Sequence, residues 1–242
     1  MKIIILAAGR GSRMGDSTEI LPKGMVSIYG KPILQHCLDT LEKAGINRED
    51  IAIVTGYHKE KIDFSGVTYF HNENWANTNM FMSLMETKSW LQQEPCIMCY
   101  SDILFSAEPI LKLIKSTADF AMTSYTGFWE LWEKRFPNPL EDLETFIIKE
   151  GKLTEIGQKP SDKSQIMGQY MGLLRISPNG WDIIEKAVKL PMPKPVEKLD
   201  MTTLLQHLLT LKNEIEVINC DDLWLECDNE EDVRVYEANY QF

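Results

Sequence analysis

The sequence predicts an α/β protein whose doubly wound sheet is mixed but mostly parallel. Two observations support this prediction. Short apolar runs rich in β-branched residues, such as KIIIL at 2–6 and IAIVTG at 51–56, are typical of buried parallel strands. These runs alternate with segments of helical length, and this order places crossover helices on both faces of a sheet.

The first half of the chain alternates regularly between strands and helices. After the strand at 2–6, a helix is expected at 30–45, because Pro32 suits a helix start and Gly45 a helix end. A second helix is expected at 78–91 with Thr78 as its N-cap, and a third at 107–115. The remaining strands of this half are expected at 51–56, 67–72, 96–100 and 119–125.

The regular alternation ends near residue 125. Residues 125–145 are acidic, aromatic and irregular, and residues 145–157 predict a hairpin that turns at Glu150 and Gly151. The later expected elements are a strand at 168–177, two helices separated by the proline-rich 190–198, strands at 214–220 and 223–228, and a helix at 230–240. We therefore expect one domain over 1–242, with a small hairpin and helical insertion at about 125–200.

Composition excludes several classes of protein. The 242 residues carry a formal net charge of −11, which disfavours nucleic acid as a partner. No apolar run approaches the roughly 20 residues that a membrane-spanning helix needs, and the N-terminal run is too short for a signal peptide. Five cysteines, an odd number, suit a reducing compartment, so a cytoplasmic location is expected. Cys96 and Cys99 lie three apart in an expected strand and are interpreted as small core residues.

A glycine-rich stretch, ILAAGRGSRMG at 5–15, follows the first strand directly. Glycines at such a turn let backbone N–H groups approach a phosphate. The spacing of Gly9, Gly11 and Gly15 is not that of a P-loop. It also differs from the dinucleotide fingerprint, and the second strand lacks the acidic residue that this fingerprint requires.

The cations of this region complete a different pattern. LAAGRGSR at 6–13 and LPKGM at 21–25 together resemble the nucleoside-triphosphate transferase superfamily. The resemblance implies a Rossmann-like nucleotidyltransferase fold, in which Arg13 and Lys23 contact the phosphates and act in catalysis. The nucleotide-binding residues that it implies in this region are Leu6, Ala7, Ala8, Gly9, Gly11, Ser12, Arg13 and Lys23.

Nucleotidyl transfer joins two anions, so carboxylates that hold Mg²⁺ are expected near the ends of the strands. Asp102 follows the apolar strand at 96–100, although a solvated strand end or a helix cap would also place an aspartate there. Glu226 and Asp228 are two apart in an expected strand and can face the same side. The resemblance implies that Asp102, also counted as catalytic, binds Mg²⁺ with Asp228 and Glu226.

The stretch NENWANTNMFMSL at 72–84 bears on the choice of base. Asn79 and Ser83 are four apart, hence neighbours on one helix face, and both are predicted to bind the nucleotide. The stretch resembles the superfamily branch that forms CDP-linked products from phosphocholine, 2-aminoethylphosphonate or phosphoglutamine. The acceptor-binding residues expected are Lys159, Gln169, Tyr170 and Asp200, the last of which also suits a helix N-cap.

The resemblance thus implies a CTP-dependent cytidylyltransferase that transfers CMP to a small phosphorylated amino compound and releases pyrophosphate. Phosphoglutamine, for capsule phosphoramidate biosynthesis, is the expected acceptor. Phosphocholine and 2-aminoethylphosphonate stay open as acceptors. A sugar-1-phosphate transferase that uses UTP or dTTP, and a nucleotide-sensing module without activity, also stay open. The sequence does not indicate the oligomeric state or the role of 125–145.

Overall fold

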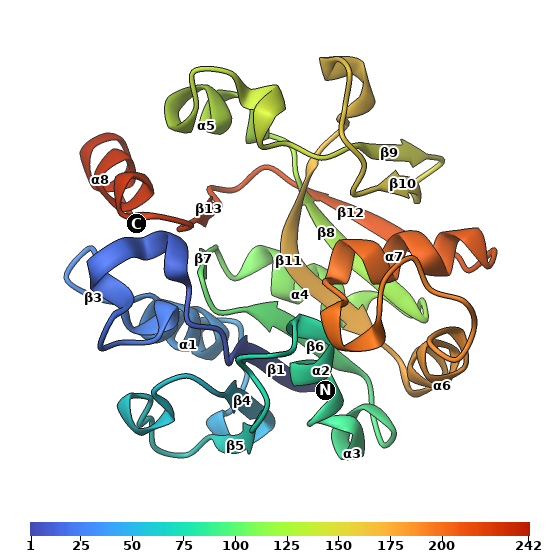
Figure 1. Ribbon diagram of the computed structural model, residues 1–242, viewed down its shortest axis with the longest axis horizontal. Helices are drawn as coiled ribbons and strands as arrows, with labels where there is room; N and C mark the ends of the chain where they lie inside the picture. Colours follow the sequence, from blue (N-terminus) through green and yellow to red (C-terminus); the bar gives the residue numbers. More distant parts are fainter.

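A computed structural model describes all residues, 1–242, and its centre is one nine-stranded sheet (Figure 1). Neighbouring strands follow the order β5-β4-β1-β6-β11-β8-β12-β10-β9. Their bounds, in that order, are Thr68–His71, Ile51–Thr55, Lys2–Ala7, Cys96–Tyr100, Gln169–Ile176, Phe120–Tyr125, Glu216–Cys220, Lys152–Ile156 and Phe146–Lys149.

The sheet is mixed but mostly parallel, which confirms the predicted class. β5, β4, β1 and β6 are parallel to one another, and β8 and β12 are parallel to each other. β11 runs antiparallel between β6 and β8, and β10 runs antiparallel between β12 and β9. Ile3, Ile4 and Ile5 of β1 are fully buried, as the unbroken apolar run predicts for a central strand.

Helices cover both faces of the sheet. Figure 1 shows α2 and α7 in front of it and α4 behind. The helices α1 to α8 span Ile33–Lys43, Met80–Met85, Lys88–Leu91, Glu108–Lys115, Phe128–Arg135, Pro178–Ala187, Met201–Thr210 and Glu230–Asn239. Short 3₁₀ segments, η1 to η7, span Ser12–Thr18, Lys23–Met25, Arg48–Asp50, Lys59–Lys61, Pro139–Glu141, Lys163–Gln165 and Val196–Lys198, and η1 is kinked at Gly15.

The helix expected at 78–91 is wrong in two respects. It is broken into α2 and α3, and the hydroxyl of Thr87 at the break donates to the carbonyl of Leu84 at 2.7 Å, in place of a regular continuation. Its N-cap is Asn79 rather than Thr78: the Asn79 side chain accepts from the backbone N–H of Met80.

The strand expected at 223–228 is also wrong in extent. Only Leu225–Glu226, β13, is a strand, and it pairs with Ile103–Leu104, β7, outside the main sheet. Another small pair joins β2, Ser27–Ile28, to β3, Lys31–Pro32. The backbone N–H of Cys227 donates to the carbonyl of Asp102 at 2.9 Å, so this pairing brings the C-terminal acidic residues to the end of β6.

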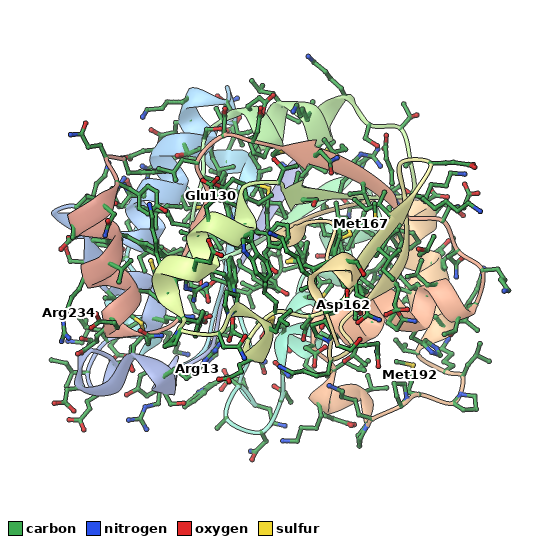
Figure 2. All side chains as sticks on the ribbon, turned by 90° about the horizontal axis from the view of Figure 1, so that it is seen from above. Arg13, Glu130, Asp162, Met167, Met192 and Arg234 are labelled. Carbon is green, nitrogen blue, oxygen red and sulfur yellow. The ribbon has the colours of Figure 1, made fainter.

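The irregular stretch 125–145 forms α5 and η5, which lie beyond the ends of β8 and β9. In both views α5 lies between α8 and the β9–β10 hairpin, and in Figure 2 Glu130 of α5 lies between Arg234 of α8 and the loop with Asp162 and Met167. The hairpin turns at Glu150 and Gly151, as predicted.

Two further expectations about the whole chain have structural counterparts. All five cysteines are free and buried, which confirms that Cys96 and Cys99 are core residues. Among the helices, none combines the length and the apolar character that crossing a membrane requires.

Candidate active site

The glycine-rich stretch leaves β1 at its carboxyl end and turns back over the sheet. Gly11 has a φ of +72°, a conformation that glycine adopts without strain. A Cβ atom at this position would lie 2.6 Å from the Cβ of Lys23. Glycine at this position therefore lets the segment that carries Lys23 pack directly against the loop.

Between this loop and α2 lies a cavity of about 210 Å³, here called the glycine-loop cavity. Of the residues predicted to bind nucleotide, Ala7 and Ser12 do not line it: Ala7 pairs with Thr55 inside the sheet, and Ser12 is an exposed residue at the start of η1. The predicted residues that do line it are Leu6, Ala8, Gly9, Gly11, Arg13, Lys23, Asn79 and Ser83.

Three carboxylates meet beside this cavity, and Asp102 is the one of them that lines it. Asp102 follows β6, while Glu226 and Asp228 come from the β13 segment. One oxygen of each lies within 4.8 Å of the others. The three predicted metal ligands are therefore brought together from distant parts of the sequence, although β13 is shorter than the strand expected there. Oδ1 of Asp102 is buried and has no hydrogen-bond partner.

The predicted cations lie among these carboxylates. Lys23 Nζ is 2.5 Å from Asp102 Oδ2 and 2.9 Å from Asp228 Oδ1. Arg13 Nη2 donates to Asp228 Oδ1 at 2.7 Å, but the Arg13 side chain is 69% exposed, whereas that of Lys23 is 11% exposed. Arg13 can therefore reach a ligand from solvent, while Lys23 is already enclosed in the site.

The pKa values of the cluster depend on these contacts. Burial alone would lower the pKa of Lys23, but the charges of Asp102 and Asp228 outweigh it and raise that pKa, so the ammonium stays charged. Burial would raise the pKa of Asp228, yet Lys23 and Arg13 hold it below its ordinary value. Burial, followed by the charges of Asp228 and Asp102, raises the pKa of Glu226.

A third cation, Arg135 at the end of α5, supports the cluster and was not singled out in the sequence. Its side chain is fully buried, and its guanidinium contacts Asp232 Oδ1 and Oδ2 at 2.9 Å each and Asp228 Oδ2 at 3.3 Å. Asp232 Oδ2 also accepts from the backbone N–H of Asp228 at 2.8 Å. The irregular stretch that carries Arg135 offered no period from which this contact could be predicted.

A second cavity of about 350 Å³ lies beside the first, towards the β9–β10 hairpin, and is here called the acidic cavity. Arg13, Met80 and Tyr100 line both cavities. The other residues of its lining are Trp132, Asp142, Glu144, Thr145, Phe146, Ile156, Gln169, Tyr170, Asp200, Thr202 and Glu226. Four of them are carboxylates and several are aromatic.

The acidic cavity contains three of the four residues predicted to bind the acceptor: Gln169, Tyr170 and Asp200. Asp200 also caps α7, accepting from the backbone N–H of Thr203 at 2.7 Å, as the sequence suggested. Lys159 lies outside the cavity lining, and its Nζ donates to the carbonyls of Leu140 and Glu141 at 2.6 Å each. Its assignment to an acceptor stays a prediction, since here its ammonium holds the η5 turn.

Two acidic residues of this cavity are Asp142, which has a hydrogen-bond partner, and Glu144, whose pKa is shifted. The indole Nε1 of Trp132 donates to Asp142 Oδ2 at 2.9 Å, and the Trp132 ring stacks on Trp224 with centroids 6.1 Å apart. Burial, followed by the charge of Asp200, raises the pKa of Glu144. A cation bound beside Glu144 would favour its ionised form and oppose this rise.

The polar side chains of Asn79, the N-cap of α2, and of Ser83 within α2 already form hydrogen bonds inside the protein. Asn79 Oδ1 caps the helix, while its Nδ2 donates to the carbonyl of Lys198 at 3.4 Å. Ser83 Oγ accepts from Asn72 Nδ2 at 3.1 Å. Trp75, which the sequence did not assign to the site, also lines the glycine-loop cavity. The neighbouring NENWA letters were the signal that could have indicated it.

Comparisons with known proteins identify relatives of this chain in both sequence and structure. The model of the MobA-like NTP transferase domain matches residues 3–158. A CTP:phosphoglutamine cytidylyltransferase of Campylobacter jejuni subsp. jejuni is 32% identical over 97% of this chain and 98% of its own. A UTP–glucose-1-phosphate uridylyltransferase of Haloferax volcanii is 28% identical over 67% of this chain and 66% of its own. The solved CTP:phosphocholine cytidylyltransferase of Streptococcus pneumoniae shares the fold, with a TM-score of 0.72 and 21% identity over 98% of this chain and 97% of its own.

Proposed function

This chain belongs to the MobA-like NTP transferase family and is a nucleotidyltransferase, and we propose that it transfers CMP from CTP to a small phosphorylated amine. The single observation that carries the proposal is the meeting of three carboxylates with Lys23 and Arg13 at the wall between the glycine-loop cavity and the acidic cavity. A triphosphate in the first cavity and a phosphorylated acceptor in the second would meet at these charges.

The reaction consists of one substitution at phosphorus. An oxygen of the acceptor phosphate attacks the α-phosphorus of CTP, a new P–O bond forms, and the bond to the β-phosphate bridging oxygen breaks to release pyrophosphate. Lys23, charged and enclosed, stabilises the negative charge that develops at the α-phosphate. Arg13, exposed at the cavity mouth, reaches the β- and γ-phosphates.

The chemistry of the carboxylates suits Mg²⁺, which we propose as the cofactor. Asp102, Glu226 and Asp228 supply oxygen ligands of the kind that this ion prefers, and the partnerless Asp102 Oδ1 has a free position for it. When bound, the ion would neutralise phosphate charge. Lys23 contacts two of these carboxylates, Asp102 and Asp228, so it keeps them in place before substrates arrive.

Two observations support cytosine as the base. The relative aligned over nearly the whole chain carries a CTP-dependent name. Asn79 stands at the N-terminus of α2 beside the glycine-loop cavity, where an amide can both donate to and accept from a base edge. Trp75 lines the same cavity and offers a flat apolar surface for a ring.

The acidic cavity supports an acceptor that carries an ammonium group. Asp142, Glu144 and Asp200 line this cavity. Lys194 pairs with Asp200, whereas Asp142 and Glu144 have no cationic partner, and Trp132 adds an aromatic face. Phosphoglutamine is our first choice of acceptor. The relative with that substrate in its name aligns with this chain over 98% of the relative's length. Phosphocholine combines a phosphate with an ammonium group, and 2-aminoethylphosphonate combines a phosphonate with one.

The test is the choice of nucleotide. Pyrophosphate release is measured with Mg²⁺ and CTP, UTP or dTTP against phosphoglutamine, phosphocholine, 2-aminoethylphosphonate and glucose 1-phosphate. We expect release with CTP and at least one amine acceptor. Release only with UTP or dTTP and glucose 1-phosphate would replace the proposal with sugar nucleotide synthesis. Nucleotide binding without release from any pair would favour a sensing role.

A further inference from the structure

Residues 196–199, here called the strap, connect the N-terminus of α2, beside the glycine-loop cavity, to Asp200 in the lining of the acidic cavity. The preceding loop has prolines at 191, 193 and 195, each of which restricts the backbone, so the strap is approached by a stiff segment. It consists of the η7 turn and Leu199, whose side chain is fully buried in the core. Met80 lines both cavities and is the first residue of α2.

One side of the strap holds the N-terminus of α2. The backbone N–H of Asn79 donates to the carbonyl of Glu197 at 2.8 Å, and that of Phe81 donates to the carbonyl of Leu199 at 3.2 Å. Asn79 Nδ2 also reaches the carbonyl of Lys198 at 3.4 Å. The first N–H groups of a helix lack partners within it, and α2 has only six residues, so the strap fixes where Asn79 stands.

The Lys198 side chain adds a contact that does not depend on the strap backbone. Its Nζ donates to the carbonyl of Asn77 at 2.8 Å, two residues before Asn79. This lysine is otherwise exposed and belongs to neither cavity lining.

The other end of the strap leads straight into the acidic cavity. Asp200 follows Leu199, caps α7 through the backbone N–H of Thr203 at 2.7 Å, and receives Lys194 Nζ at 2.5 Å. Leu199 is fully buried and directly precedes Asp200, so one anchor in the core holds both the strap and Asp200.

We propose that the strap positions Asn79 and Asp200 as one unit, so that nucleotide binding in one cavity promotes acceptor binding in the other. Lys198 is a positioning residue in this scheme. The inference rests on the proposed function, because it takes Asn79 for the nucleotide and Asp200 for the acceptor. Binding linkage requires the effect to be reciprocal.

The experiment is amide hydrogen exchange with Mg²⁺ and α,β-methylene-CTP, which cannot be turned over, and with no acceptor present. We expect the analogue to slow exchange at 79–82 and also, by about fivefold, at Thr203 in the distant Asp200 cap. In Lys198→Ala, the analogue should still slow exchange at 79–82 but should lose most of its effect at Thr203. Lys198→Arg should restore the slowed exchange at Thr203. Lys189→Ala removes another exposed lysine, with no recorded side-chain partner, and should behave like the unchanged protein.

Pro195→Gly provides a second perturbation, because it loosens the entry to the strap without touching either cavity lining. It should also reduce the protection of Thr203 while the melting temperature shows that the protein is folded. Protection of 79–82 without any at Thr203 in the unchanged protein would overturn the strap and leave the proposed function standing. Equal protection of Thr203 in all variants would also overturn the proposed role of the strap. If the analogue does not bind at all, both the strap and the proposed function are contradicted.

Discussion

Lys23 and Asp102 show how single residues define the site. Their side chains are 11% and 14% exposed, and the ion pair between them leaves Asp102 Oδ1 without a partner. A buried ion pair with an unused oxygen is costly unless a ligand uses it. This pair is therefore better explained by ligand binding than by stability.

At this scale we predict that Asp102→Asn lowers kcat by about 10²–10³-fold, because the amide keeps the shape but loses the negative charge with which Asp102 would hold Mg²⁺ against the triphosphate. The measurement is steady-state pyrophosphate release, together with a thermal melt to show that the fold survives. Asp182→Asn, which changes an exposed aspartate without a recorded partner, is the control and should leave kcat unchanged. Full activity of Asp102→Asn would remove the proposed metal and catalytic roles.

A second prediction at this scale concerns pH. The pKa of Glu144 is raised, so as pH falls this carboxyl takes up a proton before ordinary glutamates do, and an ammonium acceptor loses a counter-charge. The acceptor KM should therefore rise more steeply than the KM for CTP as pH falls through the raised pKa. The measurement is the pair of KM values between about pH 5 and 8.

The matched variant is Glu144→Gln, which cannot ionise. It should have a high acceptor KM at every pH and no such pH dependence. The sign for stability is opposite: a carboxyl with a raised folded-state pKa stabilises at low pH and loses that contribution as pH rises, so the glutamine variant should melt slightly higher near pH 7.5. An unchanged acceptor profile in this variant would exclude Glu144 from the acceptor site.

The sequence predicted the positions of some site residues but not of others. Lys23 and Asp102 lie in short patterns tied to a strand end, so their positions follow from local sequence. Trp75, Glu144 and Arg135 lie in segments without periodicity, and only the folded chain brings them to the cavities or the cluster. The contact of Lys159 with backbone carbonyls had no local signal either.

Among the elements, α5 is attached to α8 through one buried charge network. Arg135 ends α5, while Asp232 lies in the first turn of α8 and also accepts from the backbone of the segment that contains Asp228. The end of α5 therefore helps to fix the position of a proposed metal ligand.

We predict that Arg135→Ala lowers the free energy of unfolding by about 3–5 kcal/mol, because Asp232 would be left buried without its cation. Urea unfolding measures this change. Arg234→Ala is the control: this arginine is 69% exposed and pairs at the surface, so about 1 kcal/mol or less is expected. A loss from Arg135→Ala no larger than the control would show that the network does not hold α5.

Sequence patterns predicted elements better where the chain alternates between buried strands and amphipathic helices. The central strands β1, β4 and β6 lie at nearly their expected positions because each is a continuous apolar run. The helix expected at 78–91 is interrupted, because the hydroxyl of Thr87 donates to the carbonyl of Leu84. Its N-terminus is held by hydrogen bonds to the strap. Such contacts come from tertiary structure or side chains and have no helical period.

For the whole molecule, the two cavities lie at the carboxyl ends of β1 and β6, the place where ligands bind in open α/β sheets. The alternation of elements predicted this sheet and its site-bearing edge. It could not predict that β11 inserts antiparallel between β6 and β8, because that pairing joins strands about 70 residues apart and depends on packing over the whole sheet.

At this scale we predict that Mg²⁺ with α,β-methylene-CTP raises the melting temperature by about 5 °C at a hundredfold excess over its Kd, since the ligand binds only the folded state. The shift is measured by differential scanning fluorimetry. It should disappear with a chelator or in Lys23→Ala. A shift that is unchanged in both conditions would mean that the nucleotide binds away from the carboxylate cluster.

The most direct measurement of the central claim is identification of the product. CTP, phosphoglutamine and Mg²⁺ are incubated with the protein, and phosphorus NMR and mass spectrometry follow the mixture. We predict equal amounts of pyrophosphate and of a CDP-linked product whose two phosphorus signals split each other. Absence of any CDP-linked product from phosphoglutamine, phosphocholine and 2-aminoethylphosphonate would contradict the account.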